Sequence, residues 1–288
     1  MSGDTAANFA KVGICGSGIM GAGLAEVIAR AGIDVIVCAR TQDGAASMLA
    51  TVSNSLSKQV SKGKMSEDER SLAISRVRAT SSLVDLKDCD LVIESIVEDL
   101  DAKRHLFAEL DSVINEAAIL VTNTSTLAVI EMARMTKRPD RVCGLHFFNP
   151  VVVMPLVEII RPITASDETI AKVVTFVQAC GKDGVHVQDK AGFIVNALLF
   201  PYLNNAVRML ESGTASMSDI DTAMMGGCNF PMGPFALLDL VGIDTSVSIL
   251  DALYAEFNDD NYQPRPSLRR LVAEGKLGRK TGQGFYTY

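Results

Sequence analysis

Residues 12–21 have the sequence VGICGSGIMG, and this stretch decides the fold. An apolar run predicts a buried strand that ends at its first glycine, and the pattern from Ile19 to Ala31 predicts an amphipathic helix. In such a GxGxxG turn the first glycine permits a tight turn, the second lets a pyrophosphate approach the backbone, and the third lets helix and strand pack closely. The helix N-terminus offers N–H groups and positive potential to an anion. We therefore expect a dinucleotide at Gly16, Ser17, Gly18, Ile19, Met20 and Gly21.

Further apolar runs follow along the chain at residues 35–39, 91–94, 119–122 and 142–145. Strands that are apolar on both faces and separated by helices are typical of a parallel sheet covered on both sides. The polar stretch 41–76 contains Ser66 ahead of Glu69, a capping-box pattern, so we expect two helices there. The first part of the chain is thus predicted to be an α/β domain with a doubly wound, mostly parallel sheet.

From Gly192 onward the pattern becomes helical. One apolar helical stripe contains Phe193, Ile194, Ala197, Leu198, Tyr202 and Ala206. A second helix is predicted to begin at Ser218, and a third apolar segment, 235–253, follows Gly233 and Pro234. No strand-like alternation returns until the last few residues. The sequence therefore predicts a dinucleotide-binding domain over 1–190 and an all-helical domain over 191–288.

Composition excludes several function classes for this 288-residue chain. Lysine and arginine total 27 against 34 acidic residues, a net charge of −7 that does not favour nucleic-acid binding. No apolar run approaches the length of about 18 residues that a membrane helix needs, and no secretory leader is evident. The 6 cysteines stand singly, which is typical of buried reduced thiols in a cytoplasmic protein, and 3 histidines do not favour a metal site.

The end of the second strand bears on the choice of cofactor. A site specific for NAD usually has an acidic residue there, about 20 residues beyond the glycines, that holds the ribose 2′-hydroxyl. This chain has Ala39 and Arg40 instead, while Asp34 begins the strand and Asp43 lies beyond it. An arginine can pair with a 2′-phosphate, which favours acceptance of NADP. The alternatives are that Arg40 is solvated or stacks on the adenine, and the choice between NAD and NADP stays open.

A histidine follows the run 142–145, at the strand end where α/β sheets bind their ligands. His146 is followed along the chain by Glu158, which lies within the apolar run LVEII. A carboxylate in such surroundings needs a partner, because an unpaired buried charge is costly. A histidine–glutamate pair meets that need and makes a general base.

At these motifs the chain resembles the L-3-hydroxyacyl-CoA dehydrogenase family, and within it the short-chain 3-hydroxybutyryl-CoA dehydrogenases. The matching strings cover nearly the whole chain in family order: GSGIMGAG, IVEDLDAK, NTSTL, GLHFFNPV, LVEII, GFIVNALL, DIDTAM, PMGPFALLDLVG and KTGQGFY. The resemblance implies a Rossmann domain followed by a helical dimerisation domain. It also implies oxidation of the 3-hydroxyl of an acyl-CoA, with hydride transfer to a nicotinamide cofactor, and a homodimer.

Carried over by motif, the resemblance makes His146 the general base and Glu158 the residue that orients it. Ser125 and Asn196 would hydrogen-bond the substrate oxygens, although Ser125 also fits a helix N-cap and Asn196 a buried amide between helices. The resemblance assigns cofactor contacts to Ala39, Arg40, Glu98, Lys103, Asn123, Ser125, Asn149 and Lys280. It assigns contacts with CoA to Ser55, Lys62 and Ser125, and a small basic cluster of Lys58, Lys62 and Lys64 suits the CoA phosphates. Taken singly, each of these charged residues fits a solvated surface position equally well.

Two other functions remain open at this point. A dehydrogenase of a polyol acid, or of another hydroxy acid without CoA, could use the same His146 and Glu158. A hydroxyisobutyrate-type enzyme would need a lysine on the helical domain, and residues 192–205 contain none. The combination of His146, Glu158, Ser125 and Asn196 argues against a non-catalytic dinucleotide-binding protein. The apolar segment 235–253, like the resemblance, favours a homodimer.

Overall fold

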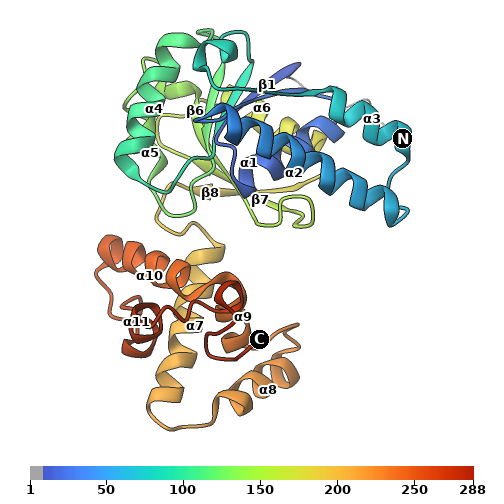
Figure 1. The fold of residues 1–288 in the computed structure, drawn as a ribbon. Coiled ribbons are helices and arrows are strands. Elements are labelled where there is room, and N and C mark those ends of the chain that lie inside the picture. The colour runs from blue at the N-terminus through green and yellow to red at the C-terminus, as the bar shows by residue number, and fades with distance from the viewer. Residues whose placement is uncertain (1–8) are drawn as a thin grey trace, which may run out of the picture. The chain divides into compact units, whose positions relative to one another are not determined.

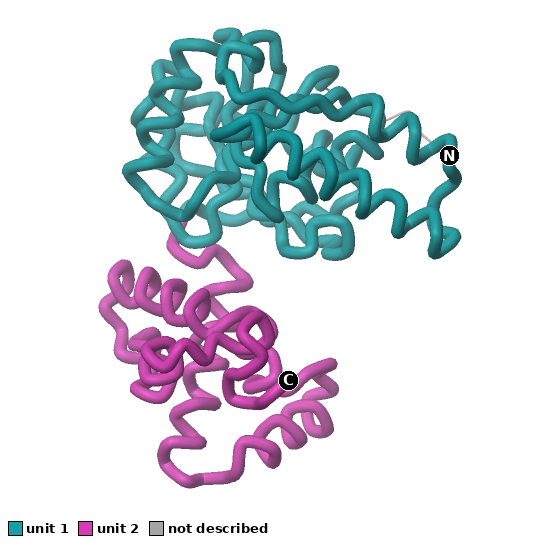
Figure 2. The backbone as a smooth tube through the Cα atoms, viewed as in Figure 1, with its two compact units in different colours: residues 1–189 teal, residues 190–288 magenta. Residues whose placement is uncertain are grey.

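The computed structural model describes residues 9–288 of the chain. The chain divides into two compact units, residues 1–189 and residues 190–288, which are coloured separately in Figure 2. The first unit is an α/β structure and the second is helical (Figure 1).

The described part of unit 1 contains one eight-stranded sheet with the order β3-β2-β1-β4-β5-β6-β7-β8. Its strands are β1 (Lys11–Cys15), β2 (Asp34–Cys38), β3 (Val77–Thr80), β4 (Leu91–Glu94), β5 (Ile119–Thr122), β6 (Val142–Phe147), β7 (Leu156–Arg161) and β8 (Asp183–Gln188). The strands β3, β2, β1, β4, β5 and β6 are parallel to one another. β7 is antiparallel to β6, and β8 is parallel to β7. The doubly wound, mostly parallel sheet is confirmed. Because the strand order reverses direction at β1 and β4, ligands are expected at the carboxyl ends of these central strands.

Three of the strands were not predicted. β3 is short and carries the polar residues Arg78 and Thr80. β8 lies at the sheet edge, with an alternation of exposed and half-buried residues in DGVHVQ that is too polar to stand out as a buried strand. β7 coincides with the apolar run that contains Glu158, and its antiparallel direction depends on the short return after β6.

Helices cover both faces of the sheet in unit 1. They are α1 (Ile19–Arg30), α2 (Gln42–Ser61), α3 (Glu67–Ser75), α4 (Leu100–Val113), α5 (Val129–Ala133) and α6 (Asp167–Ala179), with short 3-10 turns at η1 (Leu83–Leu86) and η2 (Pro139–Arg141). The predicted capping box at the start of α3 is present, because Ser66 and Glu69 bond each other's backbone N–H groups. Figure 1 shows α1 and α2 side by side, with α4 and α5 on the other side of the strands.

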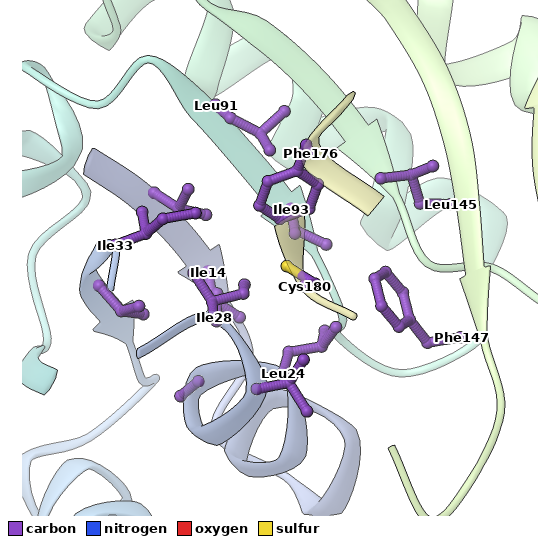
Figure 3. Packing of buried hydrophobic residues seen from close by; sticks show 14 of the residues in the cluster. Ile14, Leu24, Ile28, Ile33, Leu91, Ile93, Leu145, Phe147, Phe176 and Cys180 are labelled. Carbon is purple, nitrogen blue, oxygen red and sulfur yellow. The ribbon is translucent and has the colours of Figure 1, made fainter. Parts of the chain in front are cut away.

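The core of unit 1 lies between the sheet and the helices α1, α2 and α6. Figure 3 shows Leu24 and Ile28 of α1 directed at Ile14 and Ile93 of the central strands. Phe176 of α6 closes the same cluster, and its ring is completely buried. This packing holds β1 and α1 in place and thereby fixes the turn between them.

Unit 2 consists of α7 (Val195–Glu211), α8 (Met217–Cys228), α9 (Pro234–Val241), α10 (Ile243–Phe257) and α11 (Pro266–Ala273), followed by the 3-10 turn η3 (Arg279–Thr281). The apolar segment 235–253 forms two helices, because Gly242 has a φ of +104° and separates α9 from α10. Its side chains Phe235, Leu238 and Leu250 are completely buried within unit 2. Most apolar side chains of this segment therefore belong to the unit's own core, but Leu240 is 50% exposed.

The apolar stripe predicted for α7 is only partly correct. Phe193 and Ala206 are buried, but Leu198 is 71% exposed, and the buried face of the helix also passes through Phe200, Leu203 and Val207. The polar residue Asn196 lies on that buried face. A stripe drawn through the apolar residues alone therefore finds only part of the true core side.

The cysteines and the helix lengths complete the description. All 6 cysteines are free thiols and five positions are buried as predicted, but the prediction is wrong for Cys228, which is exposed at the end of α8. Within residues 9–288, no helix is both long enough and apolar enough to cross a bilayer.

Candidate active site

The turn after β1 is built so that two of its glycines cannot be replaced. Gly16 has a φ of +119°, and a Cβ atom on it would lie 2.2 Å from the carbonyl oxygen of Ser95. A Cβ atom on Gly21 would lie 2.0 Å from the carbonyl oxygen of Gly16. Real side chains do not tolerate either approach, so both residues have to be glycine for β1 and α1 to pack as they do.

The start of α1 fits a dinucleotide phosphate. A Cβ atom on Gly18 would meet no protein atom within 4 Å, so the backbone there faces open space. No side chain caps α1, and its first turn has no acidic residue. By contrast, five other helices of the described chain begin with a capping side chain, from Thr41, Ser66, Asp99, Ser166 and Ser216. The first N–H groups of α1 are thus left for an anion.

The end of β2 presents no carboxylate to a bound ribose. Ala39 is 2% exposed, and Arg40 beside it is exposed at the carboxyl edge of the sheet. Asp34 lies at the opposite end of β2, where Arg76 donates to its Oδ1 at 2.9 Å. Asp43 lies in the first turn of α2. Of the two acidic residues nearest in sequence, Asp34 therefore lies at the other end of the strand and Asp43 belongs to the helix that follows.

The histidine and the glutamate predicted to pair are direct neighbours across the β6–β7 ladder. His146 is opposite Glu158 in the antiparallel register, and its Nδ1 lies 2.6 Å from Oε2 of Glu158. Glu158 is completely buried, and His146 is 6% exposed. Because a carboxylate only accepts hydrogen bonds, Nδ1 carries the proton, and Nε2 is the ring nitrogen that can accept one. The pair therefore has the geometry of a base and the residue that orients it.

Residues around His146 fix the end of β6. Asn123, just past β5, accepts the backbone N–H of Phe147 at 2.9 Å through its side-chain oxygen. The ring of Phe148 lies 4.4 Å from the imidazole ring, centroid to centroid. Asn149 follows and is exposed. The structure therefore brings Asn123, His146 and Asn149 to one end of the sheet.

Glu98 organises the β5–α5 loop, residues 123–128, which carries Ser125. Its Oε1 accepts hydrogen bonds from the Thr124 hydroxyl at 2.5 Å and from the backbone N–H groups of Ser125 at 2.8 Å and Thr126 at 3.2 Å. Burial alone would raise the pKa of Glu98, but the Lys103 ammonium and the hydrogen bonds from Thr124 and Ser125 lower it below its ordinary value. Glu98 is therefore held as an anion against this loop.

Lys103 is not the solvated charge that its helical sequence also allowed. It is 1% exposed, and its Nζ lies 2.6 Å from Oε1 of Glu94 and 3.2 Å from Oε2 of Glu98. Sequence reasoning missed Glu94, which is completely buried at the end of β4 and also accepts from the backbone of Ile96 and the hydroxyl of Thr122. The available signal was the same as for Glu158, namely a carboxylate within an apolar run.

Of the three residues predicted to contact CoA, Ser125 lies in the β5–α5 loop, whereas Ser55 lies on α2 and Lys62 directly follows it. Ser55 is half-buried on α2. Burial raises the pKa of Glu26 on α1, although Ser55 and Arg30 nearby act in the opposite direction. Lys62 follows the last turn of α2 and is exposed, as are Lys58 and Lys64. The basic cluster is therefore available to solvent at the far end of this helix.

Two predicted site residues belong to unit 2. Asn196 lies in the first turn of α7 and is 7% exposed. Lys280 lies in η3, where its Nζ is 2.6 Å from both carboxylate oxygens of Asp244.

Comparison with known proteins agrees with this arrangement in both units. The profile of the 3-hydroxyacyl-CoA dehydrogenase NAD binding domain matches residues 11–190. The profile of the 3-hydroxyacyl-CoA dehydrogenase C-terminal domain matches residues 192–288.

Individual relatives match over nearly their whole length. The chain is 45% identical to a 3-hydroxybutyryl-CoA dehydrogenase of Mycobacterium tuberculosis over 280 residues, covering 96% of this chain and 98% of the relative. It is 45% identical to the mitochondrial hydroxyacyl-coenzyme A dehydrogenase of Homo sapiens, covering 96% and 90%. The crystal structure of (S)-3-hydroxybutyryl-CoA dehydrogenase from Ralstonia eutropha superimposes with a TM-score of 0.95 at 40% identity, covering 98% and 99%.

Proposed function

The chain belongs to the 3-hydroxyacyl-CoA dehydrogenase family, and on that premise we propose that it interconverts (S)-3-hydroxyacyl-CoA and 3-oxoacyl-CoA. The substrate pair is 3-hydroxybutyryl-CoA and acetoacetyl-CoA, by similarity to the short-chain relatives. The observation that carries this proposal is the buried pair of His146 and Glu158, with 2.6 Å between nitrogen and oxygen, at the carboxyl end of a Rossmann-type sheet.

In the oxidation direction, Nε2 of His146 takes the proton of the 3-hydroxyl group. Glu158 holds the ring through Nδ1 and stabilises the positive charge that the imidazole gains. In the reduction direction the same Nε2 returns the proton to the ketone oxygen. Ser125 and Asn196 serve as neutral hydrogen-bond partners of the substrate oxygens, suited to polarising a ketone.

A nicotinamide dinucleotide supplies the hydride acceptor or donor when it is bound. The N–H groups at the start of α1, beside Gly16 and Gly18, hold its pyrophosphate. Asn123, Ser125 and Asn149 would hold its nicotinamide half, and Lys280 would be a further contact. In this proposal the CoA phosphates are bound by Lys62 with Ser55, supported by the exposed lysines beside them.

The enzyme accepts NADP in this proposal, because Ala39 offers no carboxylate to a ribose 2′-hydroxyl and the exposed Arg40 can pair with a 2′-phosphate. Two variants with opposite expected effects test it. Arg40→Gln should weaken the affinity for NADPH by roughly tenfold, the loss of one charge-assisted pair. Ala39→Asp should shift preference towards NADH. Unchanged affinities for NADPH in both variants would refute the assignment.

We place the enzyme in the cytoplasm as a homodimer that associates through unit 2. The free thiols fit a reducing compartment. Unit 2 exposes large apolar side chains that its core does not use, at Ile194, Leu198, Met209, Met225, Phe230, Leu240 and Phe257. Leu198→Asp should weaken the dimer in light scattering at low concentration, whereas the matched Leu72→Asp on α3, also exposed, should not.

The activity is tested by the initial rate of acetoacetyl-CoA reduction with NADH and with NADPH, followed by loss of nicotinamide absorbance. Turnover with either cofactor supports the proposal, and the ratio of the two rates reports on Arg40. If neither cofactor supports turnover, the short-chain CoA substrate is wrong, and longer acyl chains or a polyol acid are tested next.

A further inference from the structure

A chain of charged groups runs from the interior of unit 1 to the loop that carries Ser125. It begins at Glu94 on β4, passes through the ammonium of Lys103 on α4, and reaches the carboxylate of Glu98. From Glu98 it continues to the hydroxyl and N–H groups of the β5–α5 loop. Each link is a hydrogen bond or ion pair of 2.5 to 3.2 Å. Together the links join residues 94–103 to residues 124–126 of the β5–α5 loop.

The inner part of this chain of groups is buried. Glu94 is completely buried and Lys103 is 1% exposed, while the Glu98 side chain is 35% exposed. The Lys103 ammonium contacts both carboxylates and therefore fixes the position of Glu98 relative to Glu94. A buried ion pair is weak evidence for stability by itself, because desolvation offsets most of the attraction. The contacts of Glu98 indicate what else this ion pair does.

Glu98 fixes the β5–α5 loop through its hydrogen bonds. Glu98 accepts from three consecutive residues of the loop, so a small shift of its carboxylate moves the backbone at Ser125 directly. Oε2 of Glu98 is fixed by Lys103, and Lys103 is in turn fixed by Glu94. Glu94 is anchored by the backbone of Ile96 at 2.7 Å and by the hydroxyl of Thr122 at 2.7 Å. Through these contacts, the position of the β5–α5 loop depends on the strands β4 and β5.

We propose that Glu94 and Lys103 are positioning residues for the reaction, whose buried ion pair holds Glu98 against the β5–α5 loop and so holds Ser125 in place for the substrate. The proposal rests on the proposed function for the role of Ser125. It gives Lys103 a positioning role through Glu98 in addition to the cofactor contact that the family resemblance implies.

The test is a set of variants compared in single-turnover reduction of acetoacetyl-CoA. Glu98→Gln and the double variant Glu94→Gln/Lys103→Met should each lower the rate by roughly 10- to 50-fold, the effect of losing charge-assisted hydrogen bonds in the site. The rate of the triple variant, which combines Glu94→Gln, Glu98→Gln and Lys103→Met, should be within about threefold of the rate of Glu98→Gln. The effects of residues that act through one another are not additive. The dissociation constant of NADPH should change less in the double variant than the rate does.

A second buried ion pair of unit 1 supplies the matched control. Nε of Arg138 lies 2.8 Å from Oδ1 of Asp111, and the two side chains are 8% and 7% exposed. The variant Asp111→Asn/Arg138→Met should lower Tm to a similar degree and keep the wild-type rate. Should the double variant of Glu94 and Lys103 fail to fold, Glu94→Gln alone keeps the Lys103–Glu98 contact and should lower the rate several-fold, again without adding to Glu98→Gln.

Two results would overturn the proposal. One is a triple variant whose loss equals the product of the separate losses, and the other is a double variant that turns over like wild type. A readout independent of activity is amide hydrogen exchange in residues 123–128, which should be faster in Glu98→Gln and in the double variant but not in the Arg138 control. If wild type fails to reduce acetoacetyl-CoA, the proposed function fails, and hydrogen exchange still decides whether the ion pair orders the loop. Exchange at the wild-type rate in both variants would refute the ordering role itself.

Discussion

Two buried carboxylates, Glu158 on β7 and Glu94 on β4, occupy similar surroundings with different partners. Each is completely buried, and each lies 2.6 Å from a nitrogen of a basic side chain. Glu158 pairs with an imidazole, a group that gains and loses a proton near neutral pH. Glu94 pairs with an ammonium, which in general keeps its proton through that range. Distance and burial are therefore alike, and the chemistry of the partner separates a proton-transfer pair from a static one.

The largest expected effect comes from removing the imidazole. His146→Ala should lower kcat for acetoacetyl-CoA reduction by about 10³-fold, because general acid–base catalysis is lost. Its NADPH dissociation constant should remain near that of wild type in fluorescence titration. His105→Ala is the matched control, since the His105 side chain on α4 is 78% exposed and its Nε2 lies 3.3 Å from Oε1 of Glu109. A wild-type rate in His146→Ala would show that His146 is not the general acid and base, and that its pair with Glu158 does not transfer a proton.

Removing the Lys103 ammonium should lower the stability of the protein. Lys103→Met leaves Glu94 buried with no opposite charge and should destabilise the protein by about 3 kcal/mol in urea unfolding. Adding Glu94→Gln to that variant should restore part of the loss, because no charge then remains unpaired at that position. Stability unchanged by Lys103→Met would contradict a stabilising contact between Lys103 and Glu94.

A smaller effect is expected when only the charge of Glu158 is removed. Glu158→Gln keeps the size of the side chain but not the charge that stabilises the imidazolium, so kcat should fall by about 10²-fold. Circular dichroism should report an intact fold. A loss of less than about threefold would assign Glu158 a packing role only.

The smallest effect concerns acid stability at Glu98. Because the pKa of Glu98 in the folded protein lies below its ordinary value of 4.5, Glu98 contributes stability above that pH. This contribution is lost as the pH falls through the lowered folded value. Glu98→Gln should therefore show a shallower loss of Tm on acidification than wild type. Parallel acid profiles of the two proteins would contradict the lowered pKa.

The comparison also explains how much the sequence could predict. Glu158 was found because a carboxylate in an apolar run demands a partner, and His146 at the end of the preceding strand could supply one. Glu94 carries the same signal in LVIE, but its partner Lys103 lies in a polar helical sequence that favours a solvated charge equally well. Only the docking of α4 against the sheet buries that lysine, and such docking is a tertiary event with no local pattern.

In the fold, too, local sequence patterns could be predicted and tertiary packing could not. The GxGxxG turn and the central strands could be predicted because buried runs and glycine spacing are local features. The edge strand β8 and the orientation of α7 could not, since both depend on which neighbours cover them. In α7 the buried face includes the polar Asn196 and leaves Leu198 exposed, so apolar periodicity found the core side only in part.

The most direct test of the central claim is the solvent deuterium isotope effect on single-turnover acetoacetyl-CoA reduction in wild type, Glu158→Gln and Glu94→Gln. If Glu158 assists proton transfer from His146 while Glu94 only positions, the isotope effect should rise in Glu158→Gln and stay at the wild-type value in Glu94→Gln. An equal rise in both variants, or none in either, would contradict the distinction between the two carboxylates.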